Sequence, residues 1–150
     1  MVLFDNHNHS QFSFDGKRTT VESSAMAAVE AGLGGICFSD HCDFYVPPMK
    51  ADFEDLQKEY FDVAEQQAEI SRVQGLIGDK TKILKGIEIG MYEECHEPIR
   101  KVLSENTFDQ IIASVHYIEQ TDPYYGGFYE GKDWKEAYGS YLETIYREMT

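Results

Sequence analysis

Short apolar runs alternate along the chain with segments whose apolar residues recur every three to four positions. The runs are typical of strands, and the segments with the wider spacing are typical of helices. Four strands are predicted in this way, at residues 2–7, 35–39, 82–87 and 108–115. A helical pattern follows each strand. This order predicts an α/β fold with a parallel sheet and right-handed crossover connections.

Capping residues predict where the first two helices begin and end. Thr19-Thr20 offers an N-cap for the first helix, and Gly32 is expected to end it. The second helix is expected to begin after Asp52 and to stop near Gly75 or Gly78. Its apolar stripe consists of Phe53, Leu56, Tyr60, Val63 and Ala64, with Ile70 and Val73 as an extension.

Two further helices are predicted in the second half of the chain. Pro98 suits the first turn of a short helix that runs to about Glu105. Asp133 is expected to cap a last helix. The apolar stripe of that helix is Trp134, Tyr138, Tyr141 and Ile145. Residues 42–50 and 117–132 are predicted to be loops.

Residues of the types that bind metal ions stand where each predicted strand ends. They are His7, His9 and Asp15 after the first strand, Asp40 and His41 after the second, Glu88 after the third and His116 after the fourth. The carboxyl ends of parallel strands lie on one face, where α/β folds build their sites. Each residue alone has an ordinary explanation, such as a surface histidine, a salt-bridged carboxylate or a half-buried histidine. Their agreement at four strand ends predicts one shared metal site.

The spacing of the first motif strengthens this prediction. Asp5, His7 and His9 alternate, so in a strand they share a face. Two imidazoles there can converge on one ion, and a nearby carboxylate can join or orient them. His96 stands among glutamates and is interpreted as a surface residue. Cys37 and Cys42 flank Asp40-His41 and are interpreted as packing residues.

The ligand types indicate which ions are expected. Histidine and carboxylate ligands without thiolate suit zinc, manganese or iron. These candidate ligands are too many for one tetrahedral ion, so a cluster of two or three divalent ions is expected. Glu88 is the natural bridge, because a carboxylate has two oxygens to share. Such a cluster activates water and binds a phosphoryl group.

The charge and the cysteines narrow the partners and the compartment. The 150 residues include 13 basic and 27 acidic ones, a formal net charge of −14, which argues against nucleic acid or an anionic membrane. Three cysteines without a CxxC spacing argue against a disulfide framework. A signal peptide and a membrane-spanning run are not visible, so a cytoplasmic protein is expected.

The stretches DNHNHSQFSFDG, FSDH, KGIEIG and ASVHYIE together resemble the PHP (polymerase and histidinol phosphatase) superfamily, and within it the histidinol-phosphate phosphatase branch. The resemblance covers nearly the whole chain. It implies a distorted (β/α)7 barrel with a trinuclear metal site. The implied reaction is hydrolysis of L-histidinol phosphate, a small phosphomonoester, in histidine biosynthesis. A metal-bound hydroxide would attack phosphorus in line, without a protein nucleophile.

The resemblance also implies roles for individual residues. The implied ligand groups are His7, His9 and Glu88 for the first ion, Glu88 and His116 for the second, and Asp15 and His41 for the third. Glu88 would thus be the central catalytic ligand. Asp40 would be a carboxylate that orients a histidine rather than a ligand.

The pattern departs from a full barrel, because about four βα units are present where the family needs about seven. Residues 1–150 are therefore interpreted as the N-terminal part of a single PHP domain. A half-barrel leaves a strand edge unpaired. Self-association, or a second polypeptide that supplies the missing half, is expected.

Aromatic residues in two loops on the predicted site face are candidates for substrate contact. They are Phe44 and Tyr45 after the second strand, and Tyr124, Tyr125, Phe128 and Tyr129 after the fourth. They could stack on an imidazole ring or pack on one another. Lys17 and Arg18 are weak candidates for binding phosphate. Two alternatives stay open: another PHP-type phosphoesterase, acting on a protein tyrosine phosphate or a nucleotide, or a catalytically incomplete metal-binding fragment.

Overall fold

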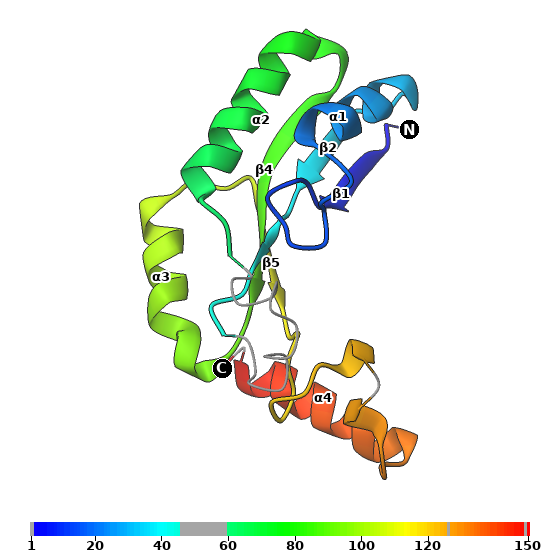
Figure 1. Ribbon diagram of the computed structural model, residues 1–150, viewed down its shortest axis with the longest axis vertical. Coiled ribbons are helices and arrows are strands. Elements are labelled where there is room, and N and C mark those ends of the chain that lie inside the picture. Colours follow the sequence, from blue (N-terminus) through cyan, green and yellow to red (C-terminus); the bar gives the residue numbers. More distant parts are fainter. Residues whose placement is uncertain (1, 46–59, 126, 149) are drawn as a thin grey trace.

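The computed structural model describes residues 2–45, 60–125, 127–148 and 150 (Figure 1). Its strands are β1 (Phe4–Asn8), β2 (Gly35–Phe38), β3 (His41–Cys42), β4 (Lys82–Gly90) and β5 (Gln110–Ser114). Its α-helices are α1 (Val21–Glu30), α2 (Val63–Ile77), α3 (His96–Glu105) and α4 (Trp134–Glu148). Short 3-10 turns cover Gly78–Lys80, Glu93–Cys95, Pro123–Tyr125 and Gly127–Tyr129. Within these ranges, no helix is long and apolar enough to span a membrane.

Each strand of the sheet runs parallel to the strands with which it pairs, as the sequence predicts. β1 pairs with β2, β2 pairs with the first half of β4, and β5 pairs with the second half of β4. The sequence predicted a loop from Cys42 onward, but His41 and Cys42 form the short strand β3 beside the second half of β4, which places His41 opposite Glu88. β2 and β3 therefore follow one another along β4 like one strand that is interrupted at Ser39-Asp40.

The first core lies between the upper half of the sheet and the helices α1 and α2. Alternate residues of β2 and β4, namely Ile36, Phe38 and Ile83, face the helices and are at most 6% exposed. α1 contributes Val21, Ala25 and Ala28, and α2 contributes Ile70, Val73 and Ile77. The three-to-four spacing of these helical residues is the reason that each helix buries one face.

A second core lies between β4 and α3. Ile87 and Ile89 of β4 pack with Cys95, which immediately precedes α3, and with Ile99, the fourth residue of that helix. Because side chains alternate along a strand, Glu88 points away from this core and toward the other face. The outer face of β4 thus packs against the helices, and the inner face carries Glu88.

Side-chain caps define the starts of two helices where the sequence predicts them. Thr20 accepts a hydrogen bond from the backbone N–H of Ser23, and Ser23 Oγ accepts one from the N–H of Thr20. Asp133 accepts from the N–H groups of Lys135 and Glu136 at the start of α4. Gly32 follows α1 with φ +70°, a conformation that suits glycine.

The second helix begins later than predicted. Asp62 caps it by accepting from the N–H groups of Ala64 and Glu65, and Val63 is its first residue. Tyr60 lies before the helix and is exposed, so its assignment to the helical stripe is wrong. The predicted cap Asp52 and the stripe residues Phe53 and Leu56 lie outside the described residues.

The last helix turns a different face inward from the one its apolar residues indicate. Its buried residues are Ala137, Thr144 and Glu148. Trp134 and Tyr138, expected in the apolar stripe, are 68% and 60% exposed. Together with Leu142 and Tyr146 they form a line of exposed apolar side chains along α4, one turn apart.

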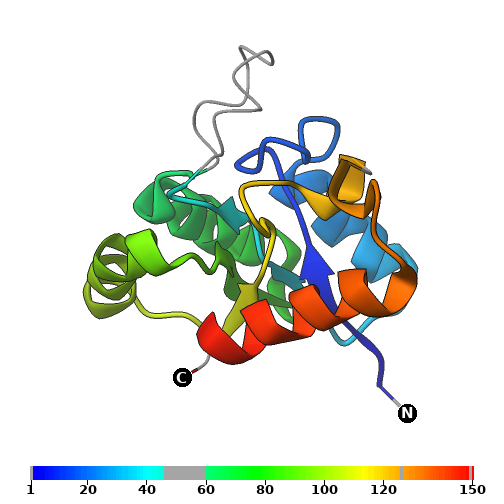
Figure 2. The ribbon, with the colours of Figure 1, turned by 90° about the horizontal axis from the view of Figure 1, so that it is seen from below.

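The sheet is an open half-barrel. Among the described strands, β1 and β5 each pair with one neighbour. Seen from below, α1, α2 and α3 lie around one side of the strands, and α4 passes across the other (Figure 2). The fold therefore confirms the predicted run of parallel βα units and leaves two sheet edges unpaired within the described residues.

Candidate metal centre

Glu88 is the centre of the candidate site. It is 4% exposed, and each of its carboxylate oxygens meets a different set of partners. Oε2 lies 3.0 Å from Nε2 of His7 and 3.1 Å from Nε2 of His9. Oε1 lies 3.0 Å from Nε2 of His116 and accepts a 2.7 Å hydrogen bond from Oγ of Ser114. The carboxylate thus links residues from both edges of the half-barrel.

The atoms around Oε2 of Glu88 fit a metal ion. The Nε2 atoms of His7 and His9 are 3.0 Å apart, so the three ligand-type atoms form a nearly equilateral triangle. An ion with tetrahedral bonds of about 2.0–2.1 Å separates its ligands by roughly 3.3 Å. Two imidazoles and one carboxylate are also a common donor set for zinc in enzymes.

Asp15 returns to the site through a tight turn after β1. Gly16 makes this turn possible, because a Cβ at this position would lie 1.9 Å from the carbonyl oxygen of Ser10. Ser13 Oγ donates a 2.6 Å hydrogen bond to Asp15. Oδ2 of Asp15 then lies 2.9 Å from Nδ1 of His9 and 3.7 Å from Nε2 of His41.

His41 lies between the other histidines, and one of its nitrogens is poorly satisfied. Its ring centroid is 4.5 Å from that of His9 and 4.7 Å from that of His116. Nδ1 of His41 is 3.4 Å from Oε2 of Glu88 and 3.5 Å from Oδ2 of Asp43. Nδ1 of His41 and Oδ2 of Asp43 are buried without a hydrogen-bond partner among the described residues. Polar atoms buried in this way are the kind that a bound cation satisfies.

Three overlapping groups of potential ligand atoms result, each with its atoms within 4.8 Å of one another. They are His7, His9 and Glu88; His9, Asp15 and His41; and His41, Asp43 and His116. The structure therefore brings together all six ligand candidates named from the sequence, although their role as ligands stays a prediction. Asp43 is a further potential ligand that the sequence analysis did not name. The sequence offered one signal for it, because Asp43 is two residues after His41 and alternate residues of an extended segment share a face.

Asp40 does not take the place predicted for it. Its buried carboxylate accepts hydrogen bonds from the N–H of Ser10 at 2.6 Å, from Ser10 Oγ and from Nε2 of Gln66 at 2.7 Å. Its partners among the described residues thus do not include a histidine. Asp40 instead fastens the turn after β1 to α2, and Asp43 contacts the histidines.

The charges around the site shift the pKa values of its members in opposite directions. Burial alone would lower the pKa of His9, but hydrogen bonds to Asp15 and Glu88 outweigh it and raise the pKa to about 9. Burial is likewise outweighed at His116, where Asp43 and Glu88 raise the pKa to about 10. Burial would raise the pKa of Glu88, yet hydrogen bonds from His116, His9 and Ser114 hold it well below its usual value. The carboxylates are therefore ionised at neutral pH, ready to bind cations.

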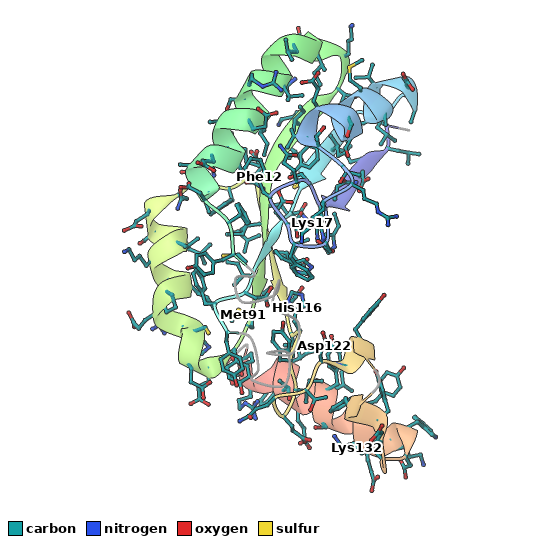
Figure 3. The ribbon with its side chains drawn as sticks, in the orientation of Figure 1. Phe12, Lys17, Met91, His116, Asp122 and Lys132 are labelled. Carbon is teal, nitrogen blue, oxygen red and sulfur yellow. The ribbon has the colours of Figure 1, made fainter. Side chains whose placement is uncertain are left out.

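A pocket of about 670 Å³ adjoins these residues. Asp15, His41 and His116 line the side toward the cluster. Aromatic residues line the rest, among them Phe14, Tyr124, Phe128, Tyr129, Tyr138 and Tyr141. Figure 3 shows His116 at the lower end of the strands, with Asp122 on the segment that leads toward α4. The pocket is thus polar at the cluster and apolar beyond it.

The other aromatic and basic candidates lie elsewhere. Phe44 and Tyr45 pack against the second core, and the ring of Tyr45 stacks on Tyr92 with centroids 4.2 Å apart. The side chain of Tyr125 lies outside what the structure describes. Lys17 lies on the loop before α1 (Figure 3). Lys17 and Arg18 are both exposed, and neither is among the residues that line the pocket.

The remaining residues singled out from the sequence have structural contacts. Asp5 accepts from the N–H of His7 and from Nδ2 of Asn8 rather than from an imidazole. His96 is only partly exposed, and its Nε2 lies 3.2 Å from Oε2 of the buried Glu148, a contact that its glutamate-rich sequence did not indicate. Cys37 and Cys42 are buried and free.

Two curated proteins are similar to this chain over nearly its whole length. A histidinol-phosphatase of Lactococcus lactis subsp. lactis is 38% identical over 143 residues, which cover 95% of this chain and 50% of that protein. A probable histidinol-phosphatase of Clostridium acetobutylicum is 30% identical over 144 residues, which cover 96% and 51%. The chain spans about half the length of the curated relatives it matches.

Solved structures give the same assignment of fold. The crystal structure of histidinol phosphate phosphatase from Lactococcus lactis subsp. lactis, complexed with zinc, L-histidinol and phosphate, matches with a TM-score of 0.80 and 33% identity over 93% of this chain and 50% of that one. The crystal structure of a putative histidinol phosphatase from Listeria monocytogenes matches with a TM-score of 0.66 and 19% identity, over 93% of this chain and 58% of that one, and supports the fold alone.

A model of the PHP domain matches residues 5–149. This range includes all six ligand candidates named from the sequence, and the strands and helices that hold them. The resemblance noted in the sequence is confirmed, and the chain belongs to the PHP domain family.

Proposed function

We propose that this chain forms the metal-binding part of a phosphomonoesterase that hydrolyses L-histidinol phosphate to histidinol and phosphate. The observation that carries the proposal is the meeting of both Glu88 oxygens with histidines from opposite edges of the half-barrel. The similarity to a phosphatase structure complexed with zinc, L-histidinol and phosphate supports the substrate. A role in histidine biosynthesis and a cytoplasmic location belong to the same proposal.

We infer that two or three divalent ions, zinc, manganese or iron, would be held by His7, His9, Asp15, His41, Glu88 and His116. Such ions supply Lewis-acid stabilisation of phosphoryl oxygens and lower the pKa of water. The carboxylates of Glu88 and Asp15 keep the histidines oriented and neutralise the positive charge of the site. Hydrolysis breaks the bond from phosphorus to the ester oxygen and forms one to the oxygen of water, and the released alkoxide takes up a proton.

The aromatic pocket would take the part of the substrate that carries no phosphate. Its polar side faces the cluster, so a phosphoryl group there places the remaining organic group among Phe128, Tyr138 and Tyr141. Aromatic rings bind another flat ring by offset or edge contacts. This pairing of an anion site with an aromatic site fits an imidazole-bearing phosphomonoester better than a nucleotide with further phosphates.

The remaining residues of the active site would come from sequence beyond these 150 residues. The match to about half the length of the relatives supports the inference that residues 1–150 are the N-terminal part of a single PHP domain. A second copy or a further polypeptide would then cover the unpaired edges of β1 and β5.

The test measures phosphate release from L-histidinol phosphate by the zinc-, manganese- and iron-loaded chain, alone and together with a polypeptide that supplies the missing part of the domain, with Glu88→Gln as the variant. The amide keeps the size of the side chain but loses the charge shared by the histidines. We expect release to fall by at least 100-fold, and we expect Glu30→Gln, at an exposed site on α1, to leave it unchanged.

Tyrosine phosphate and a nucleoside monophosphate serve as competing substrates. Faster release from either one would replace histidinol phosphate in the proposal. Metal binding without turnover of any substrate would support the alternative, a metal-binding fragment whose chemistry needs further residues.

A further inference from the structure

Asp43 lies behind two histidines of the candidate metal centre. It follows β3 and is 2% exposed. Oδ1 of Asp43 is 2.7 Å from Nδ1 of His116, and Oδ2 is 3.5 Å from Nδ1 of His41. The opposite nitrogen of His116, Nε2, is 3.0 Å from Oε1 of Glu88. The imidazole of His116 is therefore held between two carboxylates.

Without a metal ion, both carboxylates accept hydrogen bonds from the ring, whereas an ion bound at Nε2 would give the two nitrogens different roles. An ionised carboxylate can only accept hydrogen bonds, so Nδ1 of His116 must carry the proton that it donates to Asp43. An ion that takes the place of the Nε2 proton would bind the lone pair of Nε2, while Nδ1 keeps its hydrogen bond to Asp43. Histidines that bind metals commonly donate their other N–H to a carboxylate, and that contact fixes both the tautomer and the ring orientation.

Gly90 makes room for this contact. It lies two residues after Glu88 in β4 and therefore shares the inner face. A Cβ on Gly90 would lie 1.7 Å from Oδ1 of Asp43 and 3.3 Å from Nδ1 of His116. Any side chain at Gly90 would therefore displace the carboxylate from the histidine.

We propose that Asp43, admitted by Gly90, is the positioning residue that sets the tautomer and orientation of His116 toward Glu88. The inference rests on the proposed metal site, but it does not depend on which substrate is hydrolysed. The contact that carries this role is the 2.7 Å hydrogen bond that Oδ1 accepts from His116, and direct ligation through Oδ2 is the competing assignment.

The test measures zinc affinity by competition with a chelator, and the state of the His116 nitrogens from their ¹⁵N shifts in the zinc-loaded protein. Loss of such a carboxylate contact typically weakens metal binding by roughly 10- to 100-fold. We expect this loss in Asp43→Ala and a smaller one in Asp43→Asn, which keeps an acceptor oxygen. In the unaltered chain we expect Nδ1 protonated and Nε2 bound to zinc.

Two matched controls separate positioning from general damage. Glu148→Gln alters another buried carboxylate beside a histidine, His96, and should leave zinc affinity unchanged. Gly90→Ala should weaken zinc binding as Asp43→Ala does. Gly75→Ala, where an added Cβ meets no atom within 4 Å, should not.

Four outcomes are decisive. Unchanged zinc affinity in Asp43→Ala would overturn the proposal, as would ¹⁵N shifts that show zinc on Nδ1 of His116. Loss of one whole zinc ion in Asp43→Asn would overturn it in favour of a direct ligand. Zinc binding that weakens as expected, in a chain that releases no phosphate from histidinol phosphate, would support the positioning role and remove only the proposed function.

Discussion

His9 and Glu88 are 79 residues apart and belong to strand regions separated by β2, yet Nε2 of His9 lies 3.1 Å from Oε2 of Glu88. In a flat sheet, side chains of strands two places apart stand roughly 9–10 Å from each other. The contact therefore depends on the curl of the half-barrel, which tilts both side chains toward one point. A site of this kind requires the sheet to be formed before the ligands meet.

The metal-free protein should lose stability as the pH rises from about 7 to 10. His9 and His116 have pKa values of about 9 and 10, raised above the ordinary 6.5. Their contribution to stability is therefore complete below pH 6.5 and lost as the pH rises through 9 and 10. Thermal unfolding of the metal-free chain at several pH values measures this.

The same proton competition applies to metal binding, since an ion requires an unprotonated ring nitrogen. Zinc affinity should accordingly rise with pH over this range. In His116→Gln the pH dependence of unfolding should be smaller. An equal pH dependence in that variant would contradict the assignment of the raised pKa to His116.

Replacing Ser10 by alanine should destabilise the fold rather than alter the chemistry directly. Ser10 is fully buried and gives two donors to the buried carboxylate of Asp40. Ser10→Ala removes the hydroxyl donor, and a buried carboxylate left short of donors costs about 1–3 kcal/mol. Urea unfolding gives this difference. Ser71→Ala, at an exposed position of α2, is the control and should change the free energy of unfolding by less than about 0.5 kcal/mol.

Tyr141 should affect binding of the organic part of the substrate and not of phosphate. It is partly buried and lines the apolar side of the pocket. Tyr141→Leu keeps apolar volume but removes the aromatic contact, which is worth about 0.5–1.5 kcal/mol. We expect histidinol to bind roughly 2- to 10-fold more weakly by calorimetry, with the affinity for inorganic phosphate unchanged. A parallel loss for both ligands would place Tyr141 outside the organic subsite.

The exposed face of α4 should cause the chain to self-associate. Trp134, Tyr138, Leu142 and Tyr146 are each at least 60% exposed and lie on one line along the helix. Contiguous apolar patches of this kind favour association. Sedimentation velocity should show a concentration-dependent increase in size. The double variant Trp134→Gln and Leu142→Gln should reduce this increase, whereas Glu143→Gln with Arg147→Gln, at exposed positions beside this line, should not.

Local patterns were sufficient for β1, β2, β4 and β5, for most of the helix ends and for the ligand types at the strand ends. Strand periodicity and capping depend on neighbours within a few residues. The caps Thr20 and Asp133 and the apolar runs of the strands could therefore be identified from the sequence alone. The start of α2 was predicted too early, because Tyr60 continues the apolar spacing although Asp62 supplies the cap.

The sequence by itself determined that histidines and carboxylates gather at the carboxyl ends of parallel strands. Only the tertiary structure decided which acidic residue faces them. Asp40 turns toward Ser10 and Gln66, and Asp43 turns toward His116, because the break at Ser39-Asp40 separates β2 from β3 and offers each carboxylate different distant partners. The buried face of α4 was decided in the same way, since the energy of burying a side chain depends on what the rest of the chain packs against it.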